Sequence, residues 1–256
     1  MFESDQEKEL IPEIETIILP ILLFLVALLY SSVGHAGASG YLAIMALVGI
    51  APEIMRPSAL FLNILVSLIA TYKFYKAGSF SWSIFIPLVI TSIPMAFIGG
   101  RLSLPEEIYR PLVGAVLLFA AWNLVKTARN HSEYQVKEPS KLFISISGGL
   151  LGFLSGLTGV GGGIFLSPLM LFLHWAPIKV VSGVAAGFIL VNSISGLLGV
   201  VSVQTSINPS MFIWAVAVIL GGFIGAEFGS KRLGNHIILY ILAVVMLFGG
   251  LRLFFM

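Results

Sequence analysis

Residues 155–163, SGLTGVGGG, and residues 32–40, SVGHAGASG, decide how this sequence folds. Each run of glycine and serine interrupts apolar sequence. Each is followed by a short apolar segment that ends at an Ala-Pro pair, Ala176-Pro177 after residues 155–163 and Ala51-Pro52 after residues 32–40. Such a segment is shorter than the roughly 20 residues that a membrane-crossing helix needs. We therefore expect a broken or re-entrant half-helix at each run.

The composition around these runs is that of a polytopic membrane protein. Of the 256 residues, 58% are hydrophobic and only 10% are charged, whereas soluble domains contain about 45–50% apolar residues. None of the apolar segments alternates as a lipid-facing strand does, so we predict an all-α fold. The segments are 17–33, 41–51, 57–72, 82–100, 108–125, 142–158, 164–176, 180–203, 211–230 and 236–256.

The two runs belong to an internal repeat. Aligning them places Gly40 on Gly163 and the first Ala-Pro pair on the second, while residues 97–99 match 223–225 and residues 118–119 match 247–248. The offsets stay between 123 and 129 residues. We expect an acidic tail, two transmembrane repeats of four to five helical segments each, and a polar linker between them. Their ranges are 1–16 for the tail, 17–125 and 142–256 for the repeats, and 126–141 for the linker.

Charge predicts how the repeats are oriented. Cytoplasmic loops are enriched in Lys and Arg, so we place the basic linker in the cytoplasm and the tail, with six acids against Lys8, outside. The two halves then run in opposite directions, and nine of the fourteen basic residues lie inside. These nine are Lys73, Lys76, Lys126, Arg129, Lys137, Lys141, Lys179, Lys231 and Arg232. The predicted location is the bacterial inner membrane.

Several classes of protein are excluded by composition. The chain has no cysteine, which rules out disulfides, thiolate metal sites and thiol catalysis. A net charge of +2 without a basic run argues against a nucleic-acid partner. The N-terminus has no basic region before its first apolar segment, so we expect no cleaved signal peptide. We expect no metal and no cofactor. The assembly state stays open, with a homodimer as one option.

Matching glycine-interrupted segments in inverted repeats point to a transporter site where the repeats meet. The start of a half-helix presents unpaired N–H groups and about half a positive charge, which suits an anion. Ser39 and Thr158 add hydroxyl donors. The predicted substrate-binding residues are Ser32, Gly34, His35, Ser39, Gly40, Asn63, Ser155, Thr158, Gly161, Gly162, Gly163 and Asn192.

Each of these residues also has a plainer interpretation. Small residues are common where membrane helices touch, so a single run fits helix packing, and only the pair of runs favours a site. His35 could carry a coupled proton, since an unperturbed histidine has a pKa of about 6.5, or it could bond a neighbouring carbonyl. Asn63 and Asn192 either line the cavity or tie helices together.

Two charged residues near the ends of apolar segments have similar alternatives. Arg101 could draw anions into an outer vestibule, although an ordinary interfacial arginine is the simpler interpretation. Glu227 lies four residues before Lys231, and an i, i+4 ion pair accounts for it without a role in transport.

At these residues the chain resembles the sulfite exporter TauE/SafE family of membrane permeases. SGLTGVGGG is the sharp match, SVGHAGASG is a looser one, and the resemblance covers nearly the whole length. It implies export of sulfite or an organosulfonate such as sulfoacetate across the inner membrane. The residues alone indicate only a small anion. The first run departs from the glycine-rich form at His35, Ala38 and Ser39, so the two walls of the site differ chemically.

Two rival functions come from the same residues. Residues 37–40, GASG, resemble the nucleophile string of rhomboid-like intramembrane serine proteases, but such an enzyme needs a histidine from another helix. His131 falls in the linker, and His174 and His236 fall near segment ends. The repeat also places Gly162 opposite Ser39, so we do not expect an enzyme. A passive anion channel would need the same oriented dipoles, and the sequence does not separate it from a carrier.

Overall fold

The computed structural model describes residues 17–32, 37–129, 136–137, 139–203, 209–231 and 236–255. Within these ranges the chain forms ten helices and no strand, and six helices are long and apolar enough to cross a membrane. The predicted all-α, multi-pass fold is confirmed. The helices are α2 (Leu19–Ser32), α3 (Ala38–Val48), α4 (Pro52–Lys76), α5 (Trp82–Arg101), α6 (Glu106–Arg129), α7 (Lys141–Thr158), α8 (Gly163–Phe172), α9 (Ile178–Val201), α10 (Met211–Lys231) and α11 (His236–Phe255).

These ten helices fall on the ten predicted apolar segments. One boundary differs in a way that propensity explains. The apolar segment 108–125 ends at residue 125, but α6 continues to Arg129. Lys126, Ala128 and Arg129 are all good helix formers, so the helix extends into the polar linker before the chain leaves it.

Helices α7 and α8 form a hairpin. The ring of Phe143, at the start of α7, packs edge-on against Trp175, just past α8, with ring centroids 5.9 Å apart. Close by, the N–H of Lys137 donates to the carbonyl of His174 at 2.8 Å. Both ends of the hairpin therefore lie where α6 ends and α7 begins, which we call the linker end of the bundle. Segment 164–176 returns to that end.

The two short helices stop in the same way. The residue after the last turn takes a left-handed conformation, Gly49 (φ 84°) after α3 and His174 (φ 58°) after α8. In each case the N–H of the next residue donates to the carbonyl five residues earlier, at 2.9 Å. This is the hydrogen bond of a Schellman motif. The two motifs are offset by 125 residues, as the Ala-Pro pairs are, so the short helices of the two halves end in the same backbone structure.

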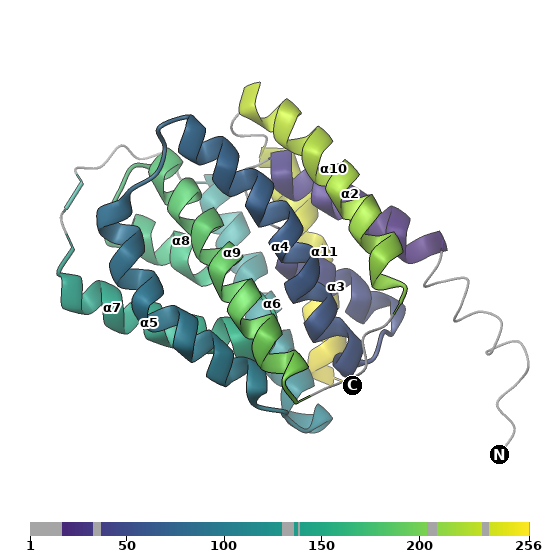
Figure 1. Cartoon of the computed structure of the whole chain (residues 1–256). Coiled ribbons are helices and arrows are strands. Elements are labelled where there is room, and N and C mark those ends of the chain that lie inside the picture. Colours follow the sequence, from purple (N-terminus) through teal and green to yellow (C-terminus); the bar gives the residue numbers. More distant parts are fainter. Residues whose placement is uncertain are drawn as a thin grey trace, which may run out of the picture.

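Each half of the chain packs a helix against the first helix of the other half. Helix α5 lies along α7 at one edge of the molecule and α10 lies along α2 at the opposite edge (Figure 1). In both pairs glycine lets the backbones touch, because a Cβ atom would overlap a facing carbonyl oxygen. The facing pairs are Gly152 with Ser92, Gly156 with Ala96, Gly221 with Phe24, and Gly225 with Leu28. The residue numbers rise together, so both pairs run parallel.

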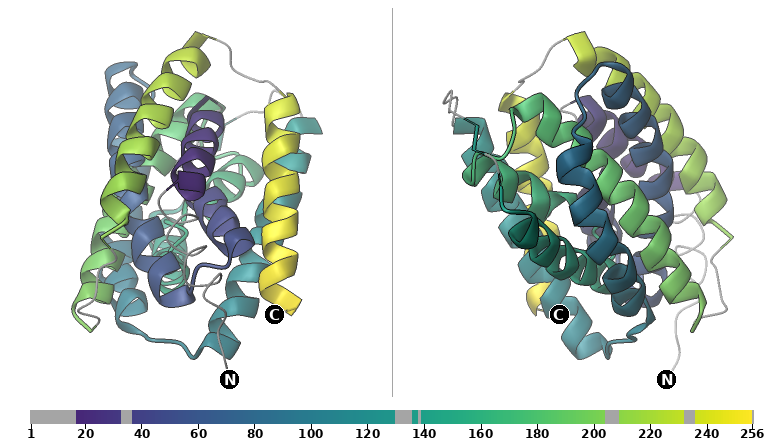
Figure 2. Two further views of the ribbon diagram at one scale, coloured as in Figure 1. Left: turned by 90° about the vertical axis from the view of Figure 1, so that its right-hand side faces the viewer. Right: turned by 60° about the vertical axis from the view of Figure 1, so that its left-hand side comes forward.

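Helices α4 and α9 pack against each other between these two edges (Figure 1), and α6 packs against α11 (Figure 2). Since α5 runs parallel to α7, it starts at the linker end, and α4 ends there. The helix directions place most basic residues at one of the two ends. Near the linker end lie Lys73, Lys76, Lys126, Lys141 and Lys179. Near the opposite end lie Arg56, Arg101, Arg110 and Arg252. The arrangement is consistent with inverted repeats, and which end faces the cytoplasm stays a prediction.

Candidate functional site

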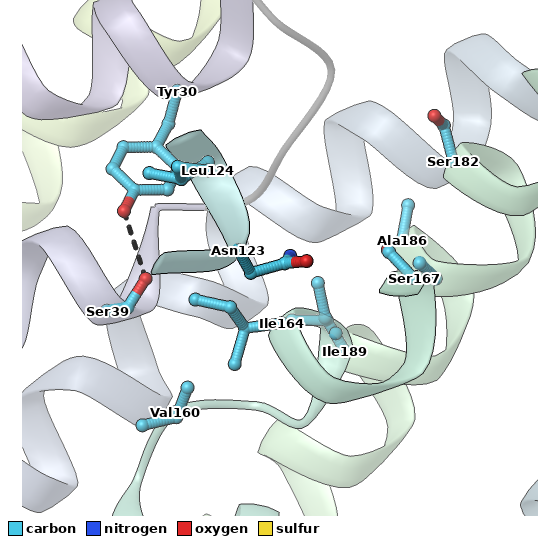
Figure 3. Close-up of a pocket in the computed structure, with 12 residues that line it drawn as sticks. Tyr30, Ser39, Asn123, Leu124, Val160, Ile164, Ser167, Ser182, Ala186 and Ile189 are labelled. Atoms are coloured by element: carbon cyan, nitrogen blue, oxygen red, sulfur yellow. Dashed lines mark hydrogen bonds between the residues drawn. The ribbon is translucent and has the colours of Figure 1, made fainter. Parts of the chain in front are cut away.

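A small cavity of about 30 Å³ lies where the two glycine-rich runs approach each other (Figure 3). Five elements or segments enclose it: the end of α2, the start of α3, the end of α6, the loop and first turns of α8, and the first half of α9. Among the described residues that line it, none carries a charged side chain. The lining consists of Tyr30, Ser39, Asn123, Leu124, Val160, Gly163, Ile164, Ser167, Ser182, Ala185, Ala186 and Ile189.

The first wall of the cavity is built by Tyr30 and Ser39. Their hydroxyl groups share a hydrogen bond of 3.0 Å (Figure 3), and both side chains are buried. The Tyr30 hydroxyl also donates to the Met246 sulfur at 3.4 Å. Ser39 is the second residue of α3, so its hydroxyl lies beside the positive end of that helix. Because each hydroxyl has one proton, the pair can donate to an anion only after these bonds are redirected.

The second wall is the turn between α7 and α8. Gly159, Gly161 and Gly162 have φ angles of +83°, +79° and +77°, which residues with a Cβ atom rarely adopt. A Cβ atom at Gly162 would also lie 2.8 Å from the Phe188 ring. These glycines reverse the direction of the chain, so α8 begins at Gly163, which lines the cavity. The N–H groups of the first turn of α8 therefore lie beside the cavity.

Behind this turn lies a second group of polar side chains that do not line the cavity. The Asn63 amide donates to the Val160 carbonyl and to the Ser193 hydroxyl, both at the long distance of 3.5 Å. Asn63 Oδ1 and Ser155 Oγ are buried without a hydrogen-bond partner. A buried polar atom without a protein partner is costly, so these two oxygens are candidates to bind a water or a ligand.

The remaining predicted polar residues bond within their own helices or to backbone. Thr158 Oγ1 donates to the Leu154 carbonyl at 2.7 Å and accepts from the Val160 N–H at 3.4 Å. The Asn192 amide donates to the Phe188 carbonyl at 2.7 Å, one turn back in α9. Its Oδ1 atom is buried and unpaired. In this state Thr158 holds the turn rather than facing the cavity.

The structure thus divides the predicted site residues into groups. Ser39 and Gly163 line the cavity, whereas Asn63, Ser155, Thr158, Gly161 and Gly162 surround the turn behind it. Gly40 fits the packing interpretation, because a Cβ atom there would lie 2.6 Å from the Tyr30 ring. Gly34 and His35 lie outside the described residues, as does the side chain of Ser32.

The two charged candidates lie away from the cavity lining. Arg101 is exposed at the end of α5, with its guanidinium 5.9 Å from the centre of the Phe97 ring. Glu227 pairs with Lys73 of α4 at 3.9 Å, so it links two helices from different halves near the linker end.

Four polar lining residues are absent from the set that the sequence predicts: Tyr30, Asn123, Ser167 and Ser182. In the sequence Tyr30 and Ser167 look like ordinary members of apolar segments, and Asn123 is an amide within one. That amide is the available signal, because a buried amide in a membrane segment is expensive unless it has a role. Asn123 and Ser167 are each only 9% exposed. Ser182, which also lines the cavity, is one of the serines that accompany Asn192 in the sequence.

Comparison with known proteins gives one family. The model of the sulfite exporter TauE/SafE family matches residues 19–253. A probable membrane transporter protein of Sinorhizobium fredii is 38% identical over 242 residues, covering 93% of this chain and 98% of that protein. Another from Bacillus subtilis is 25% identical over 240 residues, covering 86% and 92%. None of the solved structures gives a significant match.

Proposed function

Because the chain belongs to the sulfite exporter TauE/SafE family, we propose that it is a secondary transporter that exports a small sulfur-containing anion across the inner membrane. Sulfite or an organosulfonate such as sulfoacetate is the proposed substrate, and alternating access is the proposed mechanism. The family and the similar proteins are membrane transporters by name. The proposed substrate is taken from the family, because the residues alone indicate only a small anion, and the mechanism is inferred from the paired glycine-rich runs.

The observation that carries the proposal is that both glycine-rich runs reach one cavity. Ser39 comes from the first run and Gly163 from the second. Each begins a short helix whose N-terminal end carries about half a positive charge. The lining supplies hydroxyl and amide groups but no charged side chain among its described residues. Neutral donors of this kind hold an oxyanion without the strong ion pair that would slow its release.

The size of the cavity limits what it can hold. A single buried water needs roughly 10–15 Å³ on this measure, so about 30 Å³ holds no more than a few waters. A sulfite ion has four heavy atoms and needs more space. Loading therefore requires the surrounding helices to separate. We propose that the buried polar group around Asn63 and Ser155 gains its missing hydrogen bonds in the loaded state.

The position of the cavity suggests the side from which substrate enters. Asn123 lies in the last turns of α6 and Ser182 in the second turn of α9, both near the linker end. We propose that anions reach the cavity from this end, which the charge pattern assigns to the cytoplasm.

Export of an anion needs no additional energy source. One negative charge leaving a cell that is negative inside gains about 2.3 kcal/mol per 100 mV. A proton on His35 would add coupling. The His35→Ala variant would then lose the pH dependence of flux at about pH 6.5, where an unperturbed histidine titrates.

Transport by purified protein in liposomes tests the proposal. The panel should contain sulfite, sulfoacetate, taurine, sulfate and thiosulfate, with protein-free liposomes as control. We expect saturable flux of a sulfur oxyanion and counterflow, in which unlabelled anion on one side drives uptake of labelled anion. Flux that does not saturate and shows no counterflow would identify a channel, and no flux of any of these anions would reject the proposed substrate class.

A further inference from the structure

Arg56 lies in the second turn of α4 and is only 8% exposed. Its guanidinium donates to four backbone carbonyls on two other helices. On the α5 side, Nη2 bonds Gly99 at 2.5 Å and Gly100 at 2.8 Å, and Nη1 bonds Leu102 at 2.8 Å. On the α7 side, Nε and Nη2 bond Gly156 at 3.0 and 2.8 Å. One side chain therefore connects the ends of α5 and α7 to the start of α4.

The carbonyls that Arg56 bonds are the kind that a helix end leaves unpaired. The last turn of a helix has four carbonyls without an intrahelical partner and about half a negative charge. Helices α5 and α7 end side by side, so their negative ends add. A planar guanidinium with five N–H donors is suited to bonding several carbonyls at once.

Arg56 is also connected to the turn that forms the second wall of the cavity. A Cβ atom at Gly159 would lie 3.2 Å from both Arg56 Cγ and the Arg56 carbonyl, so the turn starts directly against this residue. From α6, the Tyr109 hydroxyl donates to the Thr158 carbonyl at 3.0 Å. Arg56 and Tyr109 thus hold the residues immediately before Val160 and Gly163, which line the cavity.

We propose that Arg56 is a positioning residue for anion transport. It neutralises the carbonyl ends of α5 and α7 and fixes the turn, so that an anion in the cavity meets the N–H groups of α8 and not the carbonyls of α7. Arg56 itself does not line the cavity. The role belongs to one half only, because the Ala-Pro alignment places Val181 opposite it. This inference rests on the proposed function, since it assigns a residue to that site.

The test compares Arg56→Gln and Arg56→Lys with wild type in the liposome assay, measuring KM and Vmax for the transported anion. Arg110→Gln is the matched control, because Arg110 is an arginine near the same end of the bundle and pairs with Glu106 on its own helix. We expect Arg56→Gln to raise KM by about tenfold, as loss of buried hydrogen bonds weakens the site. Arg56→Lys should give an intermediate KM, and Arg110→Gln should leave KM unchanged.

A purely structural role would give a different result. It would reduce the number of active molecules, which lowers Vmax and leaves KM at the wild-type value, and that outcome would overturn the proposal. If the Arg56 variants do not reach the membrane, Gly159→Ala decides the matter, because it keeps the guanidinium but displaces the turn. A raised KM in Gly159→Ala supports the proposal and a wild-type KM rejects it. Absence of saturable flux in the wild type would instead reject the proposed function.

Discussion

At the scale of single residues, the turn before α8 shows why glycine is needed at specific positions. Gly162 combines a φ of +77° with close neighbours on both sides, Phe188 and Ser155. Gly78, in the turn between α4 and α5, has a similar φ of +68° but nothing within 4 Å of a Cβ atom. The two glycines share a backbone conformation and differ in packing and in distance from the cavity.

This difference gives the first prediction. Gly162→Leu should reduce anion flux by about tenfold or more, because the side chain would displace Phe188 or the turn that starts α8. Gly78→Leu carries a comparable backbone strain and should retain flux. Initial rates in liposomes, normalised to the amount of inserted protein, check both. Wild-type flux in Gly162→Leu would show that the turn is not part of the site.

The repeat in the sequence is enough to single out the two runs that contain Ser39 and Gly163, although it aligns Ser39 with Gly162 and Gly163 with Gly40. It cannot identify Tyr30 or Asn123, whose contact with the cavity depends on how α2 and α6 pack against helices of the other half. Arg56 is hidden for a similar reason. In the sequence it is one basic residue among fourteen, and only the meeting of α4 with the ends of α5 and α7 gives it bonding partners.

At the scale of elements, the pairing of α5 with α7 depends on one face of α7. Gly148, Gly152 and Gly156 recur every four residues, and a Cβ atom at any of them would overlap a carbonyl of α5. Gly149 lies on the same helix, yet its Cβ atom would be no closer than 3.7 Å to Thr91. Close backbone contact of this kind is a main source of helix association in lipid.

The second prediction is a contrast between two alanine substitutions in α7. Gly152→Ala should lower the free energy of unfolding by about 1–3 kcal/mol, because the methyl group forces the helices apart. Gly149→Ala should be neutral or slightly stabilising, since alanine is the better helix former. Thermal unfolding in detergent, followed by loss of helical signal, measures the difference. Equal melting temperatures for the two variants would contradict the observed packing.

The helices themselves are predictable because each apolar segment is bounded by glycine, proline or charge. Their pairing is not, because both halves contain glycines at small-residue spacing and the sequence does not say which helix each glycine faces. The short segments show the same limit. Their length indicates half-helices, but the return of α8 to the linker end is established by the contact of Phe143 with Trp175.

At the scale of the whole molecule, the helix directions assign each connection to one of two ends. Ala77, between α4 and α5, is exposed at the linker end, and Ser103, between α5 and α6, is exposed at the opposite end. The positive-inside rule, applied to the sequence, also places these two connections on opposite sides, with Lys73 and Lys76 inside and Arg101 outside. Which end faces the cytoplasm rests on that charge pattern alone.

The third prediction uses the absence of cysteine from the chain. Single variants Ala77→Cys and Ser103→Cys should react with a membrane-impermeant maleimide from opposite sides. In intact cells we expect labelling of Ser103→Cys only, with Ala77→Cys reacting after permeabilisation. The reverse pattern would invert the predicted orientation. Labelling of both variants from the same side would contradict the arrangement of α5 across the membrane.

The exchange of helices between the halves also determines how the protein must be made. Phe24 of α2 meets Gly221 of α10, so nearly the whole remaining chain has to be synthesised before α2 finds its partner. At about 5–20 residues per second, the wait is about 10–40 seconds. During that time α2 sits in the bilayer with its backbone-contact face open to lipid or to other proteins, whereas α5 waits only about 3–12 seconds for α7. A ribosome that stalls at the linker would leave an N-terminal fragment with two unmatched helices.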